Sequence, residues 1–155
     1  MSGDSDLIKL YSGRILALAA DIPLTDRLPQ AEATVKKRSP LCGSIVTVDL
    51  SLENGVVSAF GQDVKACALG QAAASVVGGA LLGCSIEQTF KARDQLRELL
   101  KGSGKIPDAP FEGFEVFLPA SAYRNRHASI LLSIEAACEA IDQITEDKKN
   151  AAHPV

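Results

Sequence analysis

The sequence predicts an α+β domain in which a small antiparallel β-sheet is packed by N-terminal and C-terminal helices. Apolar and polar residues alternate on both sides of an Asn-Gly pair, which indicates a β-hairpin over residues 44–65. Apolar residues also recur at three- and four-residue steps over residues 5–20 and 121–147, which indicates amphipathic helices. Strands grouped between helices are typical of the α+β class.

The size and charge of the chain limit its class. With 155 residues and a mass of 16.3 kDa, we expect a single domain over residues 1–155, with frayed ends at 1–4 and 149–155. Its net charge is −3, and only 5% of its residues are aromatic, with no Trp. Nucleic-acid binding needs cations and stacking rings, so this class of partner is not expected.

Neither end of the chain nor its apolar middle predicts a membrane protein. Asp4 and Asp6 occupy the positions where a secretory peptide carries cations, and no apolar run follows, so we expect a cytoplasmic protein. Residues 66–86 carry no charge, but they are rich in Ala and Gly and lack aromatic or basic anchors. This stretch therefore predicts a buried helix, and we expect no membrane partner.

The hairpin has a definite predicted register. If Asn54 and Gly55 are the central turn residues, partners lie at equal distances from the turn. This register pairs the following residues: Leu52 with Val57, Leu50 with Ala59, Val48 with Gly61, Ser51 with Ser58, and Thr47 with Gln62. It leaves two discordant pairs, Asp49 with Phe60 and Val46 with Asp63. At the open end, it sets Cys42 opposite Cys67.

The remaining elements follow from local signals. A short strand is expected near residues 34–37, where the cations Lys36, Lys37 and Arg38 are typical of a solvated edge rather than a binding patch. A helix over residues 68–82 would place Cys67 at its N-terminus, where the helix dipole favours the thiolate.

Further along the chain, Ser85 and Gln88 form a capping-box pattern that opens another helix, which is expected to end before Gly102. Residues 102–119 are rich in Gly and Pro and predict a loop folded back by its phenylalanines. The last helix is expected over residues 121–147, with His127 at the start of its apolar line.

Three residues could form a metal site. The chain has no phosphate-binding loop, nucleophile elbow or His-Glu-x-x-His motif, so no enzyme activity is expected. Cys42, Cys67 and His127 have the ligand chemistry of zinc, iron or an iron–sulfur cluster, and three ligands leave one position open. Spacing alone favours the simpler interpretation, in which they are small core residues and a hydrogen-bonded histidine. Cys84 and Cys138 are expected to be packing residues in a reducing compartment.

The ordered set of motifs resembles the NifU-like, U-type iron–sulfur cluster assembly scaffold family over residues 7–144. The motifs are Pro40-Leu41-Cys42-Gly43-Ser44, the hairpin, Cys67 before an Ala-rich helix, the Ser85-Ile86-Glu87 helix start, and Arg126-His127-Ala128-Ser129-Ile130-Leu131. The resemblance implies an α+β fold with a small antiparallel sheet. It also implies that sulfur comes from a cysteine desulfurase and that a [2Fe–2S] cluster is built and passed on with the help of chaperones.

Carried over by position, the resemblance implies a metal site at Cys42, Cys67 and His127, with Ser44, Asp63 and Arg126 around it. Two of the family's ligands are replaced in this chain: Ser44 occupies the position of the aspartate, and Ala128 occupies the position of the third cysteine.

From this pattern we expect a scaffold-like or cluster-delivery protein that binds iron, zinc or a labile [2Fe–2S] cluster. Its expected partners are a cysteine desulfurase, a chaperone or recipient apo-proteins, and a second copy of the chain. The alternative is a degenerate relative that acts as an interaction module or accepts a persulfide from the desulfurase.

Overall fold

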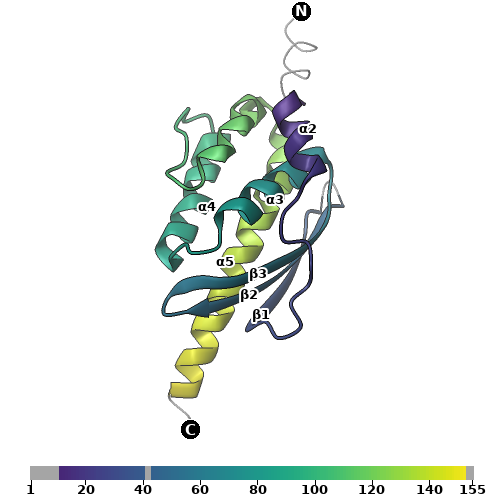
Figure 1. The fold of residues 1–155 in the computed structure, drawn as a ribbon. Coiled ribbons are helices and arrows are strands. Elements are labelled where there is room, and N and C mark those ends of the chain that lie inside the picture. The colour runs from purple at the N-terminus through teal and green to yellow at the C-terminus, as the bar shows by residue number, and fades with distance from the viewer. Residues whose placement is uncertain (1–10, 41–42, 153–155) are drawn as a thin grey trace, which may run out of the picture.

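A three-stranded antiparallel sheet is covered on one face by helices (Figure 1). The computed structural model describes residues 11–40 and 43–152. Within them the elements are α2 (Gly13–Ala20), β1 (Ala33–Arg38), β2 (Ile45–Glu53), β3 (Val56–Lys65), α3 (Ala68–Ala80), α4 (Ile86–Leu100), the 3-10 helix η1 (Glu112–Ala122) and α5 (Arg124–Ala152). The predicted α+β class is confirmed, and β1 extends the expected short strand by one residue at each end.

The helices form two layers on the inner face of the sheet. Helix α5 packs on β1 and β2, and α3 packs on β3 and on α5. Helix α2 then packs on α3, and α4 packs on the side of α5 away from the strands. In the described part of the chain, no helix is long and apolar enough to span a membrane. The charge-free stretch instead forms α3, most of which is buried, as predicted.

The hairpin register differs from the predicted one beyond its tip. Leu52 pairs with Val57 as predicted, but Ser51 pairs with Ala59, so Ser58 is an extra residue in β3. The Ser58 hydroxyl donates to the Ser51 carbonyl oxygen at 3.2 Å. Every later pair is shifted by one residue: Leu50 with Phe60, Asp49 with Gly61, Val48 with Gln62, Thr47 with Asp63, and Val46 with Val64.

This β-bulge removes both discordant pairs. Side chains alternate between the two faces of a strand, so one extra residue changes which face the rest of β3 presents. With the shift, Phe60 joins Leu50 in the core, and Asp63 lies across from Thr47 on the outer face. The pairing that set Cys42 opposite Cys67 rested on the unshifted register and loses its basis. Cys42 itself lies outside the described residues.

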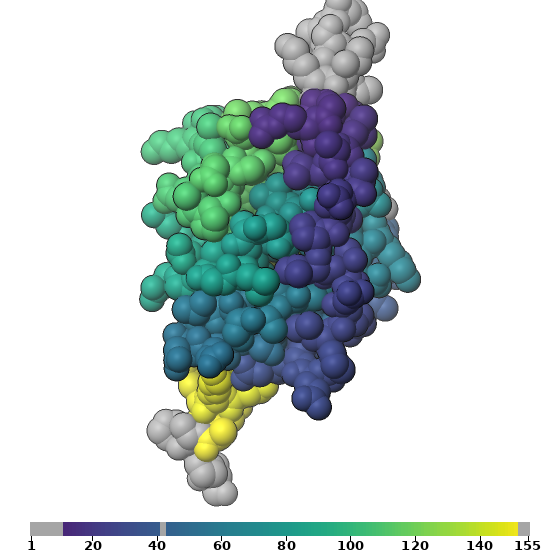
Figure 2. All heavy atoms as spheres, in the orientation of Figure 1, coloured from purple at the N-terminus to yellow at the C-terminus, as the bar shows by residue number. Residues whose placement is uncertain are grey.

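A strap, residues 21–32, crosses the outer face of the sheet. Figure 2 shows it within the purple-to-blue band down one side of the molecule. The strap begins at the free edge of β3, where the Gln62 amide donates to the Leu24 carbonyl oxygen at 2.9 Å. It then passes over Gly61, where a Cβ atom would collide with the Asp26 carbonyl oxygen. The glycine therefore allows the strap to lie directly on the strand.

Asp49 fixes the middle of the strap to the sheet. Its fully buried carboxylate accepts hydrogen bonds from Arg27 Nε at 2.6 Å, Arg27 Nη2 at 3.1 Å, the Leu28 amide at 3.0 Å and Thr34 Oγ1 at 2.6 Å. Burial alone would raise the pKa of Asp49. The hydrogen bonds from Arg27, Thr34 and the Leu28 amide outweigh burial, and the net effect lowers the pKa.

Helix boundaries follow the caps with several corrections, and α3 ends at Ala80 rather than at residue 82. Ser12 caps α2 by accepting from the Ile15 amide, so residues 11–12 interrupt the helix expected over 5–20. The Ser85–Gln88 capping box is present as predicted. Helix α5 begins at Arg124 and runs through Ala152, so residues 149–152 are helical rather than frayed. Residues 5–10 and 153–155 lie outside the described part.

Part of the predicted loop is helical instead. Its aromatic residues Phe111, Phe114 and Phe117 recur every three residues, which matches the three-residue turn of a 3-10 helix. All three are buried, with ring centroids 5.9 and 6.3 Å apart. They hold η1 against α3, α4 and α5. The expected folding back is thus confirmed, although it occurs as a 3-10 helix.

Cys84 and Cys138 are packing residues, as predicted. Both are buried, and their thiols lie near the carbonyl oxygens of Ala80 at 3.1 Å and Thr89 at 3.8 Å. Burial raises the pKa of both thiols, to about 12 for Cys138. Both thiols therefore stay protonated at neutral pH.

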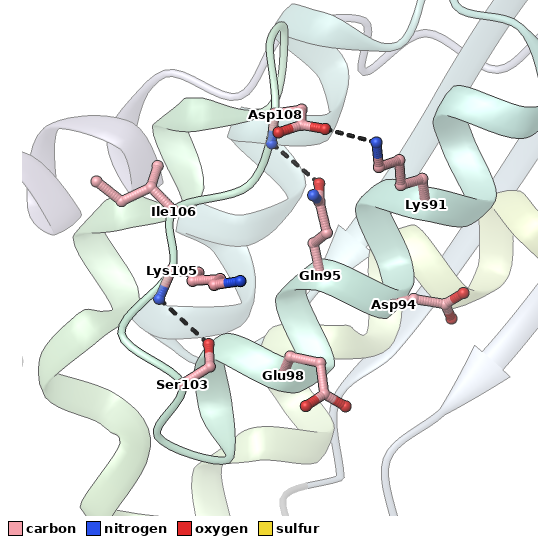
Figure 3. A pocket seen from close by; sticks show the side chains of 8 residues that line it. All are labelled: Lys91, Asp94, Gln95, Glu98, Ser103, Lys105, Ile106 and Asp108. Carbon is pink, nitrogen blue, oxygen red and sulfur yellow. Dashed lines mark hydrogen bonds and ion pairs between the residues drawn. The ribbon is translucent and has the colours of Figure 1, made fainter.

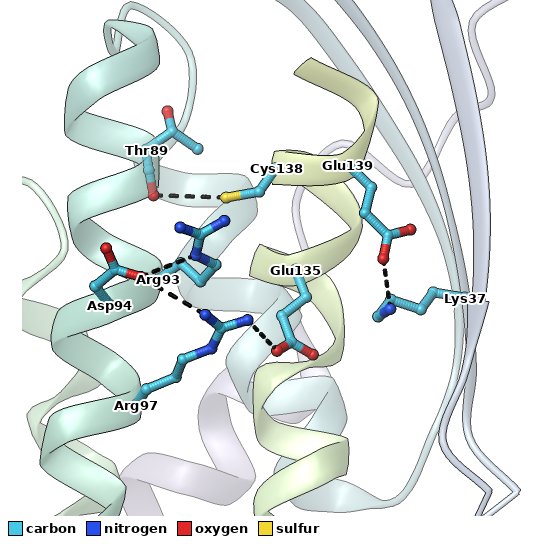
Figure 4. Close-up of polar contacts among 8 residues, drawn as sticks. All are labelled: Lys37, Thr89, Arg93, Asp94, Arg97, Glu135, Cys138 and Glu139. Carbon is cyan, nitrogen blue, oxygen red and sulfur yellow. Dashed lines mark hydrogen bonds and ion pairs between the residues drawn. The ribbon is translucent and has the colours of Figure 1, made fainter. Parts of the chain in front are cut away.

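Ion pairs surround Cys138 and join β1, α5 and α4 (Figure 4). Lys37 pairs with Glu139 at 2.5 Å, and Arg97 pairs with Glu135 at 2.7 Å. These side chains are partly exposed, and each such pair contributes at most about 1 kcal/mol. Their main effect is to fix the outer surface of α5 between its two neighbours.

Candidate functional site

Helices α3 and α5 run in the same direction across the inner face of the sheet. Gln62 of β3 joins them, because its Nε2 donates to the Ala74 carbonyl oxygen at 2.9 Å and its Oε1 accepts from Ser133 Oγ at 3.2 Å. One turn earlier on each helix, a Cβ at Gly70 would lie 3.3 Å from the Ser129 carbonyl oxygen. The N-terminal ends of α3 and α5 therefore lie side by side.

Ser44 brings the start of β2 to the same place. Its hydroxyl is buried and lies 3.1 Å from the Ser129 hydroxyl of α5. Its carbonyl oxygen accepts from the Ser39 amide at 2.8 Å, which closes the connection between β1 and β2. Gly43, with a φ of +68°, allows this tight turn. The end of the sheet that carries the Cys42 connection is thus fixed to α5 by two neutral hydroxyls.

Cys67 is the N-cap residue of α3, as predicted. Its backbone is extended, and its carbonyl oxygen accepts from the Gln71 amide at 2.9 Å. The half-buried thiol makes no capping hydrogen bond, so it does not satisfy the free amides of the first turn. The Cys67 sulfur therefore lies at the helix end where backbone amides have no intrahelical partner.

His127 lies in the first turns of α5 and contacts η1. Its Nε2 is 2.8 Å from the Ala120 carbonyl oxygen. A carbonyl oxygen only accepts, so we assign the proton to Nε2 and the free lone pair to Nδ1 in the neutral ring. Metal-binding histidines commonly hold their second nitrogen in this way. The half-buried ring is also consistent with the hydrogen-bonded histidine of the simpler interpretation.

Two of the three predicted ligands, Cys67 and His127, lie within the described residues. Successive helical residues are about 100° apart, so His127 projects from a different side of α5 than Ser129. No cluster of three His, Cys, Asp or Glu side chains suited to a metal occurs in the described ranges 11–40 and 43–152. Cys42, the first predicted ligand, lies outside them, so the full ligand set stays a prediction.

The predicted surrounding residues lie in different places. Ser44 is at the junction of β2 and α5, and Asp63 is exposed on the outer face of β3. Arg126 is half-buried at the start of α5, where its amide donates to the Tyr123 carbonyl oxygen at 2.9 Å. Ser129 was not predicted, although the Arg126–Leu131 motif that contains it was singled out. Its role depends on a long-range contact with Ser44, for which the sequence has no signal.

A wide groove lies away from this end of the sheet, and contacts between α4 and a loop account for its shape. It has a volume of about 720 Å³ and lies between α4 and the loop of residues 103–108 (Figure 3). Lys91 pairs with Asp108 at 2.8 Å, and the Asp108 amide donates to Gln95 Oε1 at 2.9 Å. These contacts hold the loop against α4 and form one wall of the groove.

Solved structures similar to this chain include a crystal structure of a nitrogen-fixing NifU-like protein (N-terminal) from Brucella abortus. It is 38% identical with a TM-score of 0.89, and the match covers 91% of this chain and 98% of that one. No family model and no curated protein matches the chain.

Two more distant structures share the fold. One is a hypothetical protein, with 19% identity, a TM-score of 0.78, and coverage of 86% of this chain and 97% of that one. The other is a putative iron–sulfur cluster assembly scaffold protein for the SUF system from Fervidobacterium islandicum AW-1. It has 18% identity, a TM-score of 0.74, and coverage of 85% of this chain and 96% of that one.

Proposed function

This chain belongs to the NifU-like family, and from that premise we propose that it works in the assembly or delivery of iron–sulfur clusters. Its cargo would be iron, zinc or a labile [2Fe–2S] cluster. We propose no enzyme activity. The observation that supports the proposal is the junction of three chain segments at one end of the sheet, where the first turn of α3, which follows the N-cap residue Cys67, lies beside the Ser44–Ser129 contact.

The proposed ligands are Cys42, Cys67 and His127. Two thiolates and an imidazole suit zinc and iron, and the Cys67 sulfur lies at a helix end that favours its negative charge. His127 would bind through Nδ1, because Nε2 already donates to the Ala120 carbonyl oxygen.

Two substitutions make the proposed site weak. Ala128 supplies no ligand, and the Ser44 hydroxyl is a neutral group that is hydrogen-bonded to Ser129. A [2Fe–2S] cluster needs four protein ligands, so cargo on this chain would be one or two ligands short. We infer that it is released easily, or that a partner or a second copy of the chain completes the site.

Anaerobic reconstitution tests the ligand assignment. The full chain is incubated with iron and sulfide, and the absorbance and the iron bound per chain are measured. Cys42→Ala and Cys67→Ala are expected to lose most of the bound iron, whereas the matched control Cys138→Ala keeps it, because that thiol is buried in the core. Iron binding by either test variant equal to that of the parent would refute the assignment.

The role of His127 needs a separate variant. His127→Gln keeps an amide that can donate to the Ala120 carbonyl oxygen from near the Nε2 position but removes the imidazole Nδ1. If the ring is a ligand, iron dissociation should be about tenfold faster than in the parent. An unchanged dissociation rate would restrict the site to the two cysteines.

Persulfide acceptance is a second candidate, favoured by the uncapped amides around Cys67. The Cys67 thiolate would attack the outer sulfur of a persulfide on a cysteine desulfurase, and the cysteine of the desulfurase would leave as the thiolate. Incubation with desulfurase and cysteine, followed by mass spectrometry, should then show a gain of one sulfur atom on Cys67. Absence of this adduct, with iron binding intact, leaves metal binding as the function.

A further inference from the structure

Cations gather on the outer face of the sheet next to the Ser39–Ser44 connection. Two rows of side chains face outward there: Lys36, Thr47 and Asp63 in one row, and Arg38, Ile45 and Lys65 in the next. The sequence shows the Lys36–Arg38 cluster but not Lys65, which the shifted register places in the same row as Arg38. We call these two rows the basic patch.

Within the described residues, the cations of the basic patch form no ion pair. Lys36, Arg38 and Lys65 are exposed and form no salt bridge with any residue in the described part of the chain. Lys37 behaves differently, because strand alternation turns it to the inner face, where it pairs with Glu139. Strand alternation thus places Lys37, which pairs with α5, on the opposite face of β1 from the cations that are available to bind a partner.

The strap limits the basic patch on one side. It covers the outer face at Gly61 and Asp49, which form the row next to Thr47. In the two rows beyond it, the flanking cations and Asp63 are exposed, whereas Thr47 is buried and Ile45 is half-buried. Lys65 is also two residues before Cys67, so a molecule on the basic patch would reach the proposed site.

The composition of the basic patch favours a protein partner. Three cations stand against one acid, Asp63, in a chain whose net charge is −3. Half-buried Ile45 lies at the centre of its row and offers an apolar contact. A phosphate backbone would gain nothing from Ile45 and would be repelled by Asp63 and by the whole chain.

We propose that the basic patch is a docking surface for a protein partner that presents acidic side chains. The inference deepens the proposed function, because the partner would supply or receive the cargo next to Cys67. Charge complementarity would raise the association rate and orient the partner, and the effect would weaken with salt. The surface needs no bound metal, so its test is independent of iron binding.

Poly-L-glutamate serves as the acidic probe, titrated at low salt into the ¹⁵N-labelled full chain without metal. Shifts are expected in the amides of β1 and of β3 near Lys65. Lys36→Glu/Arg38→Glu/Lys65→Glu should weaken binding about tenfold or more. The matched control Lys91→Glu/Lys101→Glu/Lys105→Glu changes the net charge equally on α4 and the loop that follows it, and should weaken binding much less. Circular dichroism confirms that both variants are folded.

Three outcomes would overturn the proposal: no binding of poly-L-glutamate, equal weakening by both triple variants, or tighter binding of a DNA duplex than of poly-L-glutamate at the same sites. The last result would mark a nucleic-acid surface. Iron binding by the patch variant should equal that of the parent. A loss of docking with iron retained therefore bears on this inference alone, and a loss of iron in Cys67→Ala bears on the proposed function alone.

Discussion

The Asp49 region and the Ser44 region hold neighbouring parts of the sheet in different ways. At Asp49, a buried carboxylate accepts four hydrogen bonds and fixes the strap. At Ser44, two neutral hydroxyls share one contact of 3.1 Å. The comparison indicates that fold stability depends on the Asp49 region. The Ser44 region can then change its residues, as at Ser44 and Ala128, without loss of the fold.

The largest expected effect is that of Asp49→Ala. The substitution leaves the Leu28 amide and the Thr34 hydroxyl without their acceptor and frees Arg27. We expect a loss of about 3 kcal/mol in the free energy of unfolding, measured by urea denaturation. A loss below about 1 kcal/mol would show that the strap is not held by Asp49 and would remove the contrast with Ser44.

The reactivity of two thiols compares the core, which contains Cys138, with the end of the sheet near Ser44, where Cys67 is the N-cap residue of α3. Cys138 is 1% exposed with a pKa of about 12, whereas Cys67 is half-buried at a helix end. In the native protein at pH 8, we expect a disulfide reagent to label Cys67 at least about a hundredfold faster than Cys138. Peptide mapping after labelling identifies the sites. Comparable rates would mean that the core around Cys138 opens as readily as the Cys67 end.

Acid should weaken the Asp49 region selectively. The folded pKa of Asp49 lies below its unfolded value of about 3.9, so its contribution is complete above that value and is lost as the pH falls through the folded pKa. The difference in unfolding free energy between the parent and Asp49→Asn should be constant above about pH 5 and shrink below about pH 4. Urea unfolding at a series of pH values measures it, and a difference independent of pH would contradict the assignment.

The smallest expected effect is that of Ser44→Ala. Its hydroxyl makes one neutral hydrogen bond, so the loss should be about 1 kcal/mol or less. Ser129→Ala is the matched variant. The double variant should cost less than the sum of the two single variants, because both remove the same contact. Strict additivity would show that the two hydroxyls do not interact in solution.

Local signals predicted most of the fold. The hairpin tip, the Ser85 cap and the buried α3 all follow from residues close in sequence. The bulge at Ser58 was missed because Asn54-Gly55 fixes only the pairs next to the turn. The helix η1 was missed because Pro and Gly indicate a loop, although its phenylalanines repeat at the 3-10 period.

The candidate site was less predictable than the fold. The position of Cys67 followed from its place before a helix. The Ser44–Ser129 contact joins residues far apart in sequence, and the partners of Asp49 lie on two other segments. Such contacts depend on how the elements pack, which periodicity does not encode. The resemblance to NifU-like proteins supplied the order of the motifs, and the 38% identity to a solved member confirms the family.

The extra residue at Ser58 sets the phase of everything that follows it in β3. Were Ser58 deleted, β3 could continue as a regular ladder in which Ala59 still pairs with Ser51 and Phe60 with Leu50, so the later side chains would keep their faces. A single residue inserted or deleted beyond the bulge would instead turn every side chain after it to the other face. Anyone recombining or redesigning this chain should therefore place one-residue length changes at Ser58 and preserve the parity of β3 beyond it.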